Sequence, residues 1–426
     1  MLIEFSVANF KSIKEEARLS LVASRNQEHW STHVIQMRPS VGSPVLPHVL
    51  GAAVVYGPNA GGKTNFLMAI QAMQQIVTLS STNVDKPLPV EPFMFDPKTR
   101  HEPTTFDATL LIDGVRYQYG FSATRSAVHE EWLYAWPRGR PQLWFYRQPD
   151  ESEDFSVKFG DKLGGDKLVW RRATRRNALL LSTAASLNSS QLQPIWKWFN
   201  SKLHTAGGRA FTLRYCDEVD KDAIVDFLRA AGLALDDIRI TEESFSEDML
   251  SDDLPKNHKD LFVKDLQGTK IRKAQFVHAV KNGDVVELDA EQESAGTQKM
   301  LALAGPWLDT FENGNTLVID ELEAHLHPGL VRFLVQKFHD PNLNRNGAQL
   351  IFSTHNTSIL DQSLLRRDQI WFCERDRQLA TVLSPLSDFR PRKRYENLER
   401  AYLAGRYGAV PNVRAQADST AHAYAP

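Results

Sequence analysis

The sequence predicts an α/β fold in which a mixed central sheet is accompanied by a second, antiparallel β layer. Two short and almost wholly apolar runs, residues 52–56 and 316–319, are typical of strands that are covered on both faces. In the run 105–121, two β-rich segments flank Asp113-Gly114, which is a strong hairpin signal. The apolar runs predict the core of the sheet, and the hairpin predicts the antiparallel layer.

Length and composition limit the class of protein. The chain has 426 residues, of which 42% are apolar and 24% charged, as expected of a globular protein with more than one structural unit. A net charge of −2 excludes a global basic excess, and two cysteines, Cys216 and Cys373, exclude a disulfide scaffold or a cysteine-based zinc site. No apolar stretch approaches the roughly 18 residues of a membrane helix. We expect a soluble, cytoplasmic protein without membrane contact.

The order of the remaining patterns predicts the domain organisation. Residues 3–7 alternate between apolar and polar types and predict an opening strand. Residues 191–203 and 221–231 have helical patterns, and the acidic run 242–248 reads as a surface segment. We expect an N-terminal lobe, a mainly helical insertion, a C-terminal lobe and a disordered tail, over residues 1–170, 171–290, 291–413 and 414–426.

Residues 57–64, GPNAGGKT, match the phosphate-binding pattern G-x-x-x-x-G-K-[ST] between a predicted strand and a predicted helix. The glycines let backbone N–H groups surround phosphate oxygens, and the start of the helix adds a favourable dipole. Lys63 is expected at the β- and γ-phosphates, and Thr64 at Mg²⁺. The predicted nucleotide-binding residues of this loop are Gly57, Asn59, Gly61, Gly62, Lys63, Thr64 and Asn65.

A second acidic element is expected to complete this site. The apolar strand 316–319 ends at Asp320 and Glu321, a Walker B pattern. Asp320 is predicted to hold Mg²⁺ together with Thr64, and Glu321 to polarise the water that attacks the γ-phosphate. A solvated acidic strand end is the alternative reading, and the P-loop in the same chain argues against it.

Two further elements narrow the class. Ser294 and Gly296 precede a predicted helix and could bind the γ-phosphate of another nucleotide, although Ser and Gly at a helix start are usually a simple cap. His355 follows the apolar strand 349–354 and is interpreted as a γ-phosphate sensor, although a lone histidine is more often structural.

In this order the motifs resemble an ABC-type ATPase head. The opening residues 7–13, VANFKSI, are similar to the start of RecF and of the SMC ATPases. Residues 320–328, DELEAHLHP, resemble the Walker B and D-loop of the OLD-like branch. Residues 396–411 resemble the tail of the Rlo-type ATPases, which are found beside restriction and phage-defence genes.

The resemblance implies a head-to-head homodimer or higher oligomer that sandwiches ATP and Mg²⁺ between the P-loop of one subunit and the signature of the other. The implied catalytic residues are Lys63, Glu321 and His355, and the implied signature residues are Ser294, Gly296 and Gln298. The signature departs from the family pattern: Glu293, Ala295 and Thr297 replace its usual residues, and the role of the displaced Gln298 is open.

Further implied positions lie outside these motifs. By analogy, Asn9 and Lys11 are expected near the nucleotide. His325 and His327 are expected near the dimer seam, with metal ligation as the alternative. Gln118 and Gln142 are both candidates for the Q-loop glutamine.

The expected role is that of a sensor or motor in a prokaryotic anti-phage defence system. Because the residues after His355 are too few for the nuclease domain of OLD enzymes, we expect a separate effector of nuclease-like type. A RecF-like or SMC-like ATPase of DNA repair or chromosome maintenance is the alternative, and a nucleotide-gated scaffold is a third. The basic clusters 171–176 and 390–394 are candidates for DNA or RNA contact, or simply solvated faces.

Overall fold

The computed structural model describes most of the chain, and all structural statements concern this part. The described ranges are 1–36, 46–151, 155–205, 212–213, 216, 221–247, 263, 268, 270–280, 283–390 and 396–411. The predicted disordered tail over 414–426 and the basic residues 392–394 lie outside these ranges.

The chain divides into two compact units. The P-loop unit comprises Leu2–Asn200 and Ile351–Pro426, and the central unit comprises Ser201–Leu350 with Met1. These boundaries differ from the predicted lobes 1–170, 171–290 and 291–413. Residues 171–200 belong to the P-loop unit, because their helices pack against one another and against the helix that follows the P-loop.

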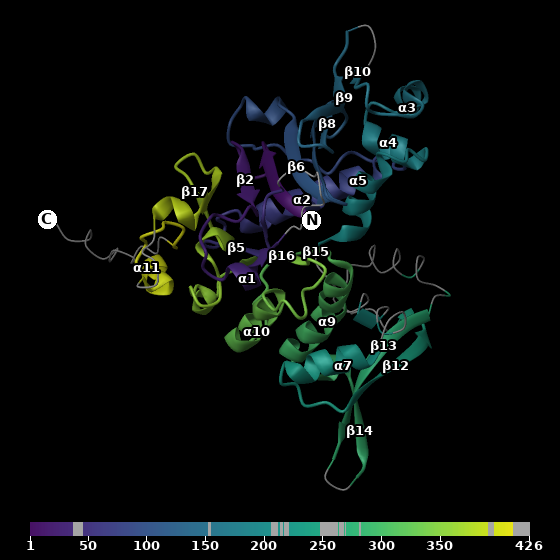
Figure 1. The fold of residues 1–426 in the computed structure, drawn as a ribbon. Helices are drawn as coiled ribbons and strands as arrows, with labels where there is room; N and C mark the ends of the chain where they lie inside the picture. Colours follow the sequence, from purple (N-terminus) through teal and green to yellow (C-terminus); the bar gives the residue numbers. More distant parts are fainter. Residues whose placement is uncertain are drawn as a thin grey trace, which may run out of the picture. The chain divides into compact units, whose positions relative to one another are not determined.

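A seven-stranded antiparallel sheet is the largest element of the P-loop unit. At the turn between its third and fourth strands along the chain, Asp113 and Gly114 both have positive φ, as the hairpin signal requires. Figure 1 shows the N-terminal strands in purple beside β6 in blue, in agreement with the pairing of β1 with β6. The order is β10-β9-β8-β7-β6-β1-β2, with β1 Leu2–Ala8, β2 Ala17–Ser20, β6 Thr104–Ile112, β7 Val115–Ala123, β8 Val128–Trp136, β9 Gln142–Gln148 and β10 Ser156–Phe159.

The strand before the P-loop lies in a second, mixed sheet. All five residues of β5 (Ala52–Tyr56) are buried, as the apolar run predicts. Strand β17 (Ile370–Arg375) runs parallel to β5 and antiparallel to β18 (Thr381–Pro385). Within the P-loop unit the order is β16-β5-β17-β18, where β16 spans Gln349–Thr354. A short pair, β3 (Val34–Ile35) and β4 (Val49–Leu50), lies apart from this sheet.

Helix α2 (Lys63–Leu79) leaves the P-loop and buries one face. Phe66, Ile70 and Met73 recur at helical spacing and are buried, and the Phe66 ring meets the Phe5 ring of β1 edge-on at 5.6 Å. The helix is therefore fixed to the antiparallel layer through its apolar stripe. The other helices of this unit are α1 Trp30–His33, α3 Lys167–Ala173, α4 Leu180–Ser186, α5 Gln193–Lys197 and α11 Leu398–Leu403.

The central unit contains the Walker B strand. In it, β11 (Leu203–Thr205) pairs in parallel with β15 (Thr316–Ile319), whose residues are all buried. Its helices are α7 Lys221–Ala230, α9 Ala295–Asn313 and α10 Pro328–Phe338. None of the helices in the described ranges combines the length and apolar character needed to cross a membrane.

The prediction of a mainly helical insertion over 171–290 is wrong for its second half. There the central unit forms a three-stranded antiparallel sheet, β12-β13-β14, over Asp237–Ser244, Lys270–Ala279 and Val285–Asp289. Buried Ala274 and Phe276 lie two residues apart, which is strand periodicity. The first three residues of the acidic run, 242–244, belong to β12. There Glu242 forms ion pairs with Lys270 and Arg272 of β13, so its charge stabilises the pairing of the two strands.

Candidate nucleotide-binding site

The P-loop joins β5 to α2, and the surrounding chain leaves its glycines no room for a side chain. A Cβ on Gly57 would lie 2.1 Å from the carbonyl oxygen of Cys373 in β17. Gly62 has φ 106°, and a Cβ there would lie 2.0 Å from Oγ1 of Thr381 in β18. The pattern of glycines is therefore dictated by β17 and β18 packing directly against the loop.

Lys63 and His355 lie side by side at this loop. The Lys63 ammonium donates to the carbonyls of Gly57 and Pro58 at 2.9 and 3.1 Å, and its Nζ lies 2.9 Å from Nε2 of His355. His355 follows β16, which places it at the carboxyl end of a strand next to β5. The predicted phosphate-binding lysine and the predicted sensor histidine, almost 300 residues apart, thus meet in one unit.

The other predicted loop residues differ in exposure. Thr64 is exposed in the first turn of α2, and Asn59 is exposed in the loop, while Gly61 is buried. The side chain of Asn65 donates from Nδ2 to Oγ of Ser12 at 2.7 Å. Asn65 therefore connects the P-loop helix to the N-terminal motif.

Asn9, which is expected near the nucleotide, has its side-chain amide engaged by another loop of the protein. It is buried, and its Nδ2 donates to the carbonyls of Thr99 and Glu102 at 2.8 Å, while its Oδ1 accepts from the N–H of Phe93. Through these bonds the Asn9 amide holds the loop 93–103 in place. Its backbone φ of 54° lies in the left-handed region, which Asn adopts more readily than most other residues.

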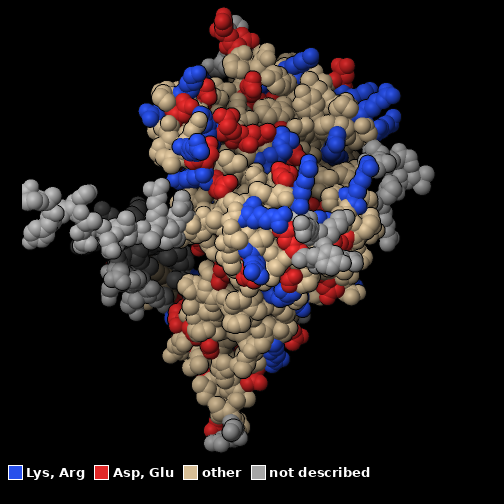
Figure 2. Space-filling model, turned by 90° about the vertical axis from the view of Figure 1, so that its left-hand side faces the viewer, with Lys and Arg blue, Asp and Glu red and all other residues tan. Residues whose placement is uncertain are grey.

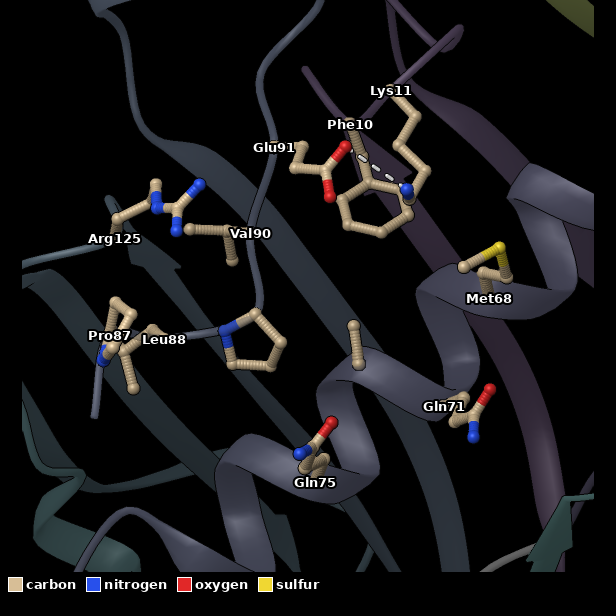
Figure 3. A pocket seen from close by; sticks show the side chains of 12 residues that line it. Phe10, Lys11, Met68, Gln71, Gln75, Pro87, Leu88, Val90, Glu91 and Arg125 are labelled. Atoms are coloured by element: carbon tan, nitrogen blue, oxygen red, sulfur yellow. Dashed lines mark hydrogen bonds and ion pairs between the residues drawn. The ribbon is translucent and has the colours of Figure 1, made fainter. Parts of the chain in front are cut away.

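Lys11 borders two adjoining pockets. Its ammonium forms an ion pair with Glu91 at 3.1 Å. The first pocket, about 330 Å³, lies between α2 and the segment Pro87–Glu91; Figure 3 shows the Lys11–Glu91 pair at one end and Gln71 and Gln75 of α2 further along.

The second pocket is larger, about 650 Å³, and shares Lys11, Glu91 and Arg125 with the first. It includes Asn65 of the P-loop helix, so it opens beside the phosphate-binding loop. Its volume is in the usual range for small-molecule sites. Sequence reasoning missed most of its lining, because Glu91, Met94, Phe95, Arg125 and Arg375 belong to no recognised motif.

The acidic pair lies in the central unit. Asp320 follows β15 and is partly exposed, and Glu321 is exposed with φ 47°. This left-handed residue ends the strand, and the N–H of Ala324 donates back to the Glu321 carbonyl to form the next turn. The predicted Mg²⁺ ligands Thr64 and Asp320 are thus divided between the two units.

The signature residues form the exposed start of α9. Oγ of Ser294 accepts from the N–H of Thr297 at 3.2 Å and caps the helix, and Gly296 lies in its first turn. A Cβ on Gly296 would lie 3.0 Å from the carbonyl oxygen of His325, so the structure brings these two segments together. The Gln298 amide donates back to the carbonyl of Glu293 at 2.9 Å, which gives this displaced residue a local role.

Neither histidine of the Walker B turn lies in a metal cluster. Nδ1 of His327 accepts from the N–H of Gly329 and caps α10. Across the described ranges, no three His, Cys, Asp or Glu side chains gather in a way that could hold a metal ion. His325 is exposed, with φ 64°.

The two Q-loop candidates lie in the antiparallel layer. The Gln118 amide in β7 donates to both carboxylate oxygens of Asp107 at 3.1 Å. Gln142 is the first residue of β9. Neither residue lines the two pockets beside Lys11.

The first basic cluster has a structural member. Arg175 donates to the carbonyls of Ser80 and Ser81, so it caps the end of α2. Arg172 and Arg176 are exposed. Figure 2 shows positive and negative side chains intermingled on the face that it presents, without an extended field of one sign.

The loop between β5 and α2 and the two sheets define a P-loop ATPase domain. Residues 52–361, more than half of the chain, match the family described as "AAA domain, putative AbiEii toxin, Type IV TA system". The chain belongs to this family. The membership confirms the predicted α/β fold class and the predicted ABC-type ATPase class.

Solved structures give weaker likenesses. An SMC head domain from Thermotoga maritima matches with 11% identity and a TM-score of 0.38, over 90% of this chain and 98% of that one. An SmcHead bound to the C-winged helix domain of ScpA matches with 12% identity and a TM-score of 0.35, over 90% and 96%. The recombination mediator protein RecF-ATPrS of the RecFOR pathway matches with 13% identity and a TM-score of 0.34, over 90% and 98%. Among curated proteins no match is found.

Proposed function

We propose that the chain binds and hydrolyses ATP with Mg²⁺ at the interface of a head-to-head dimer. The observation that carries this proposal is the 2.9 Å contact of Lys63 Nζ with His355 Nε2 at a glycine loop that the core of its unit holds in place. A cation and an imidazole at the start of a helix are suited to a terminal phosphate, because both can donate to its oxygens.

Each side chain then has a defined task. Lys63 binds the β- and γ-phosphates, and His355 responds to the presence of the γ-phosphate through the same cluster of atoms. Glu321 orients and deprotonates the attacking water. Thr64 and Asp320 would hold Mg²⁺, which would supply positive charge at the phosphates.

The signature acts on the nucleotide of the partner subunit. Ser294 is exposed at the start of α9, and the N–H groups of Ala295 and Gly296 in the first helical turn have no partner within their own helix. These groups are suited to contact a γ-phosphate brought by a second copy. Since ADP lacks that phosphate, hydrolysis would favour the open state.

The biological role we propose is that of sensor or motor of a prokaryotic anti-phage defence system with a separate, nuclease-like effector. The resemblance of residues 396–411 to Rlo-type ATPases supports this role, and the description of the family names a toxin of a toxin–antitoxin system. An ATPase of DNA repair or chromosome maintenance is the second candidate, favoured by the RecF-like opening residues 7–13.

The dimer is tested by ATP turnover at increasing protein concentration. A shared site requires the turnover rate per subunit to rise with concentration until the dimer is saturated. A rate per subunit that stays constant from nanomolar to micromolar protein would contradict the shared site. Stimulation by added DNA would favour repair, and stimulation by the product of the neighbouring gene would favour defence.

A further inference from the structure

A chain of hydrogen bonds beneath the P-loop links three distant segments of the sequence. Oγ1 of Thr381 lies 3.1 Å from the carbonyl oxygen of Gly61 and 2.8 Å from Oγ of Ser12. Oγ of Ser12 in turn lies 2.7 Å from Nδ2 of Asn65. The backbone supports the same contact, since the N–H of Thr381 donates to the Ser12 carbonyl at 2.7 Å.

The direction of each bond follows from counting hydrogens. A carbonyl oxygen can only accept a hydrogen bond, so the Thr381 hydroxyl donates its single hydrogen to the Gly61 carbonyl. At the contact with Ser12, Oγ1 of Thr381 must therefore accept, and the Ser12 hydroxyl donates its own hydrogen to it. Ser12 can then only accept from Asn65. The relay runs from Asn65 through Ser12 and Thr381 to the P-loop carbonyl, with every hydroxyl satisfied.

This direction fixes the carboxamide of Asn65. Its donor, Nδ2, must face Ser12, so the other arm of the amide is the acceptor Oδ1. Within the described part of the chain, the structure gives Oδ1 no hydrogen-bond partner. Asn65 and Ser12 both line the 650 Å³ pocket beside the loop. A ligand in this pocket therefore meets an acceptor whose orientation is set from beneath the P-loop.

We infer that Asn65 selects a nucleotide whose nucleoside part carries a hydrogen-bond donor, and that Ser12 and Thr381 are the positioning residues behind it. The inference rests on the proposed function, since it assumes that the triphosphate occupies the loop. The donor is either a ribose hydroxyl or the exocyclic amine of the base. A ribose hydroxyl would present an O–H to Oδ1 of Asn65, and the exocyclic amine would present an N–H. The deoxy analogues of ATP lack a ribose hydroxyl, and inosine triphosphate lacks the amine.

The relay also explains why the hydroxyl of Thr381 lies so close to the loop. It occupies the space that a Cβ on Gly62 would need, at 2.0 Å. Cys373 makes a weaker, parallel contact from Sγ to the Gly61 carbonyl at 3.3 Å. Of these two side chains, only Thr381 continues to Ser12 and Asn65, so the selective function depends on the hydroxyl.

The test compares the affinities of ATP, 2′-deoxy-ATP, 3′-deoxy-ATP and inosine triphosphate for the purified protein by calorimetry. We expect wild-type protein to bind at least one analogue about tenfold or more weakly than ATP, because a polar group is left without its partner. The deoxy analogues report a ribose hydroxyl and inosine triphosphate reports the amine. Similar affinities for all four nucleotides would overturn the inference.

Variants separate positioning from folding. Thr381→Val keeps the shape of the side chain but breaks the relay, so the discrimination should fall to about threefold or less, and Thr381→Ser should restore it. Asn65→Ala should also lose the discrimination between ATP and its analogues. Thr183→Val, a buried threonine in α4, is the matched control and should discriminate as wild type does.

Two outcomes distinguish the inference from the proposed function. Full discrimination retained by Thr381→Val would overturn the positioning role while ATP binding stands. Absence of ATP binding by the wild-type protein would instead overturn the proposed function itself, and this inference with it.

Discussion

The P-loop and the signature turn are both glycine-containing starts of helices, but the protein builds them differently. The P-loop has its glycines pressed against β17 and β18, and Thr381 and Cys373 contact its Gly61 carbonyl. The signature turn is exposed, and a single side chain, Ser294, caps it locally. One is part of the core of its unit, whereas the other is a surface feature.

This difference between the P-loop and the signature turn determines what a substitution in each of them should affect. A change at a P-loop glycine must disturb the packing of β17 or β18, so it affects phosphate binding within the same chain. A change at the start of α9 costs only about the 1 kcal/mol of a helix cap. An effect of such a change on ATP-dependent behaviour would therefore report contact with another subunit.

The largest effect is expected for Lys63→Ala. The variant removes the ammonium beside His355, which the structure places at the loop carbonyls of Gly57 and Pro58. ATP binding should weaken by about a hundredfold or more, and turnover should be lost with it. Calorimetric titration measures the binding, with Lys162→Ala at an exposed site as the control. Unchanged affinity would remove the assignment of the phosphate site.

Glu321→Gln should affect only the chemical step. Glu321 is exposed at the end of β15, so its amide replaces it without loss of packing. ATP affinity should stay within about twofold, while turnover falls by roughly 10²- to 10⁴-fold, the usual contribution of a general base. Phosphate release under saturating ATP measures this change. Turnover like that of wild type would show that another group activates the water.

Ser294→Arg should act on the association of two subunits. Its long side chain would occupy the space in front of α9 and block ATP-dependent dimerisation, while ATP binding to the monomer is retained. Light scattering with and without a non-hydrolysable analogue measures the assembly, and Ser294→Thr, which preserves a capping hydroxyl, is the matched control. A dimer that still forms with ATP in the arginine variant would contradict a signature that acts in trans.

The sequence was informative where local pattern determines structure. The glycine loop between the apolar run 52–56 and a helical stripe predicts a P-loop, because few residue types permit that backbone. It was uninformative about distant contacts. Nothing near Asn9 in the sequence indicates that its amide is used by the loop 93–103, and nothing near Thr381 shows that its hydroxyl lies under Gly61.

The wrong helical prediction for part of 171–290 has a related cause. Glu242 and Glu243 were interpreted as a solvated acidic run, because their partners Arg272 and Lys273 lie some thirty residues away. Once β13 is paired with β12, these charges become cross-strand neighbours. Alternation of apolar residues in β13 was a usable signal, whereas the ion pairs were not predictable from local sequence.

A buried histidine makes the stability of the P-loop unit depend on pH. In the P-loop unit, His33 is buried, with Nε2 2.9 Å from the carbonyl oxygen of Leu364, and burial lowers its pKa to about 4.

Since the unfolded chain takes up a proton on His33 near pH 6.5 and the native state only near pH 4, the contribution of His33 to stability is complete above about pH 6.5. It falls as the pH drops from there toward 4, by roughly 3 kcal/mol in all, and then levels off. Thermal unfolding across this range measures the slope. His33→Gln should flatten it, whereas His101→Gln at an exposed site should leave it unchanged. An equally steep slope in His33→Gln would place the titrating group elsewhere.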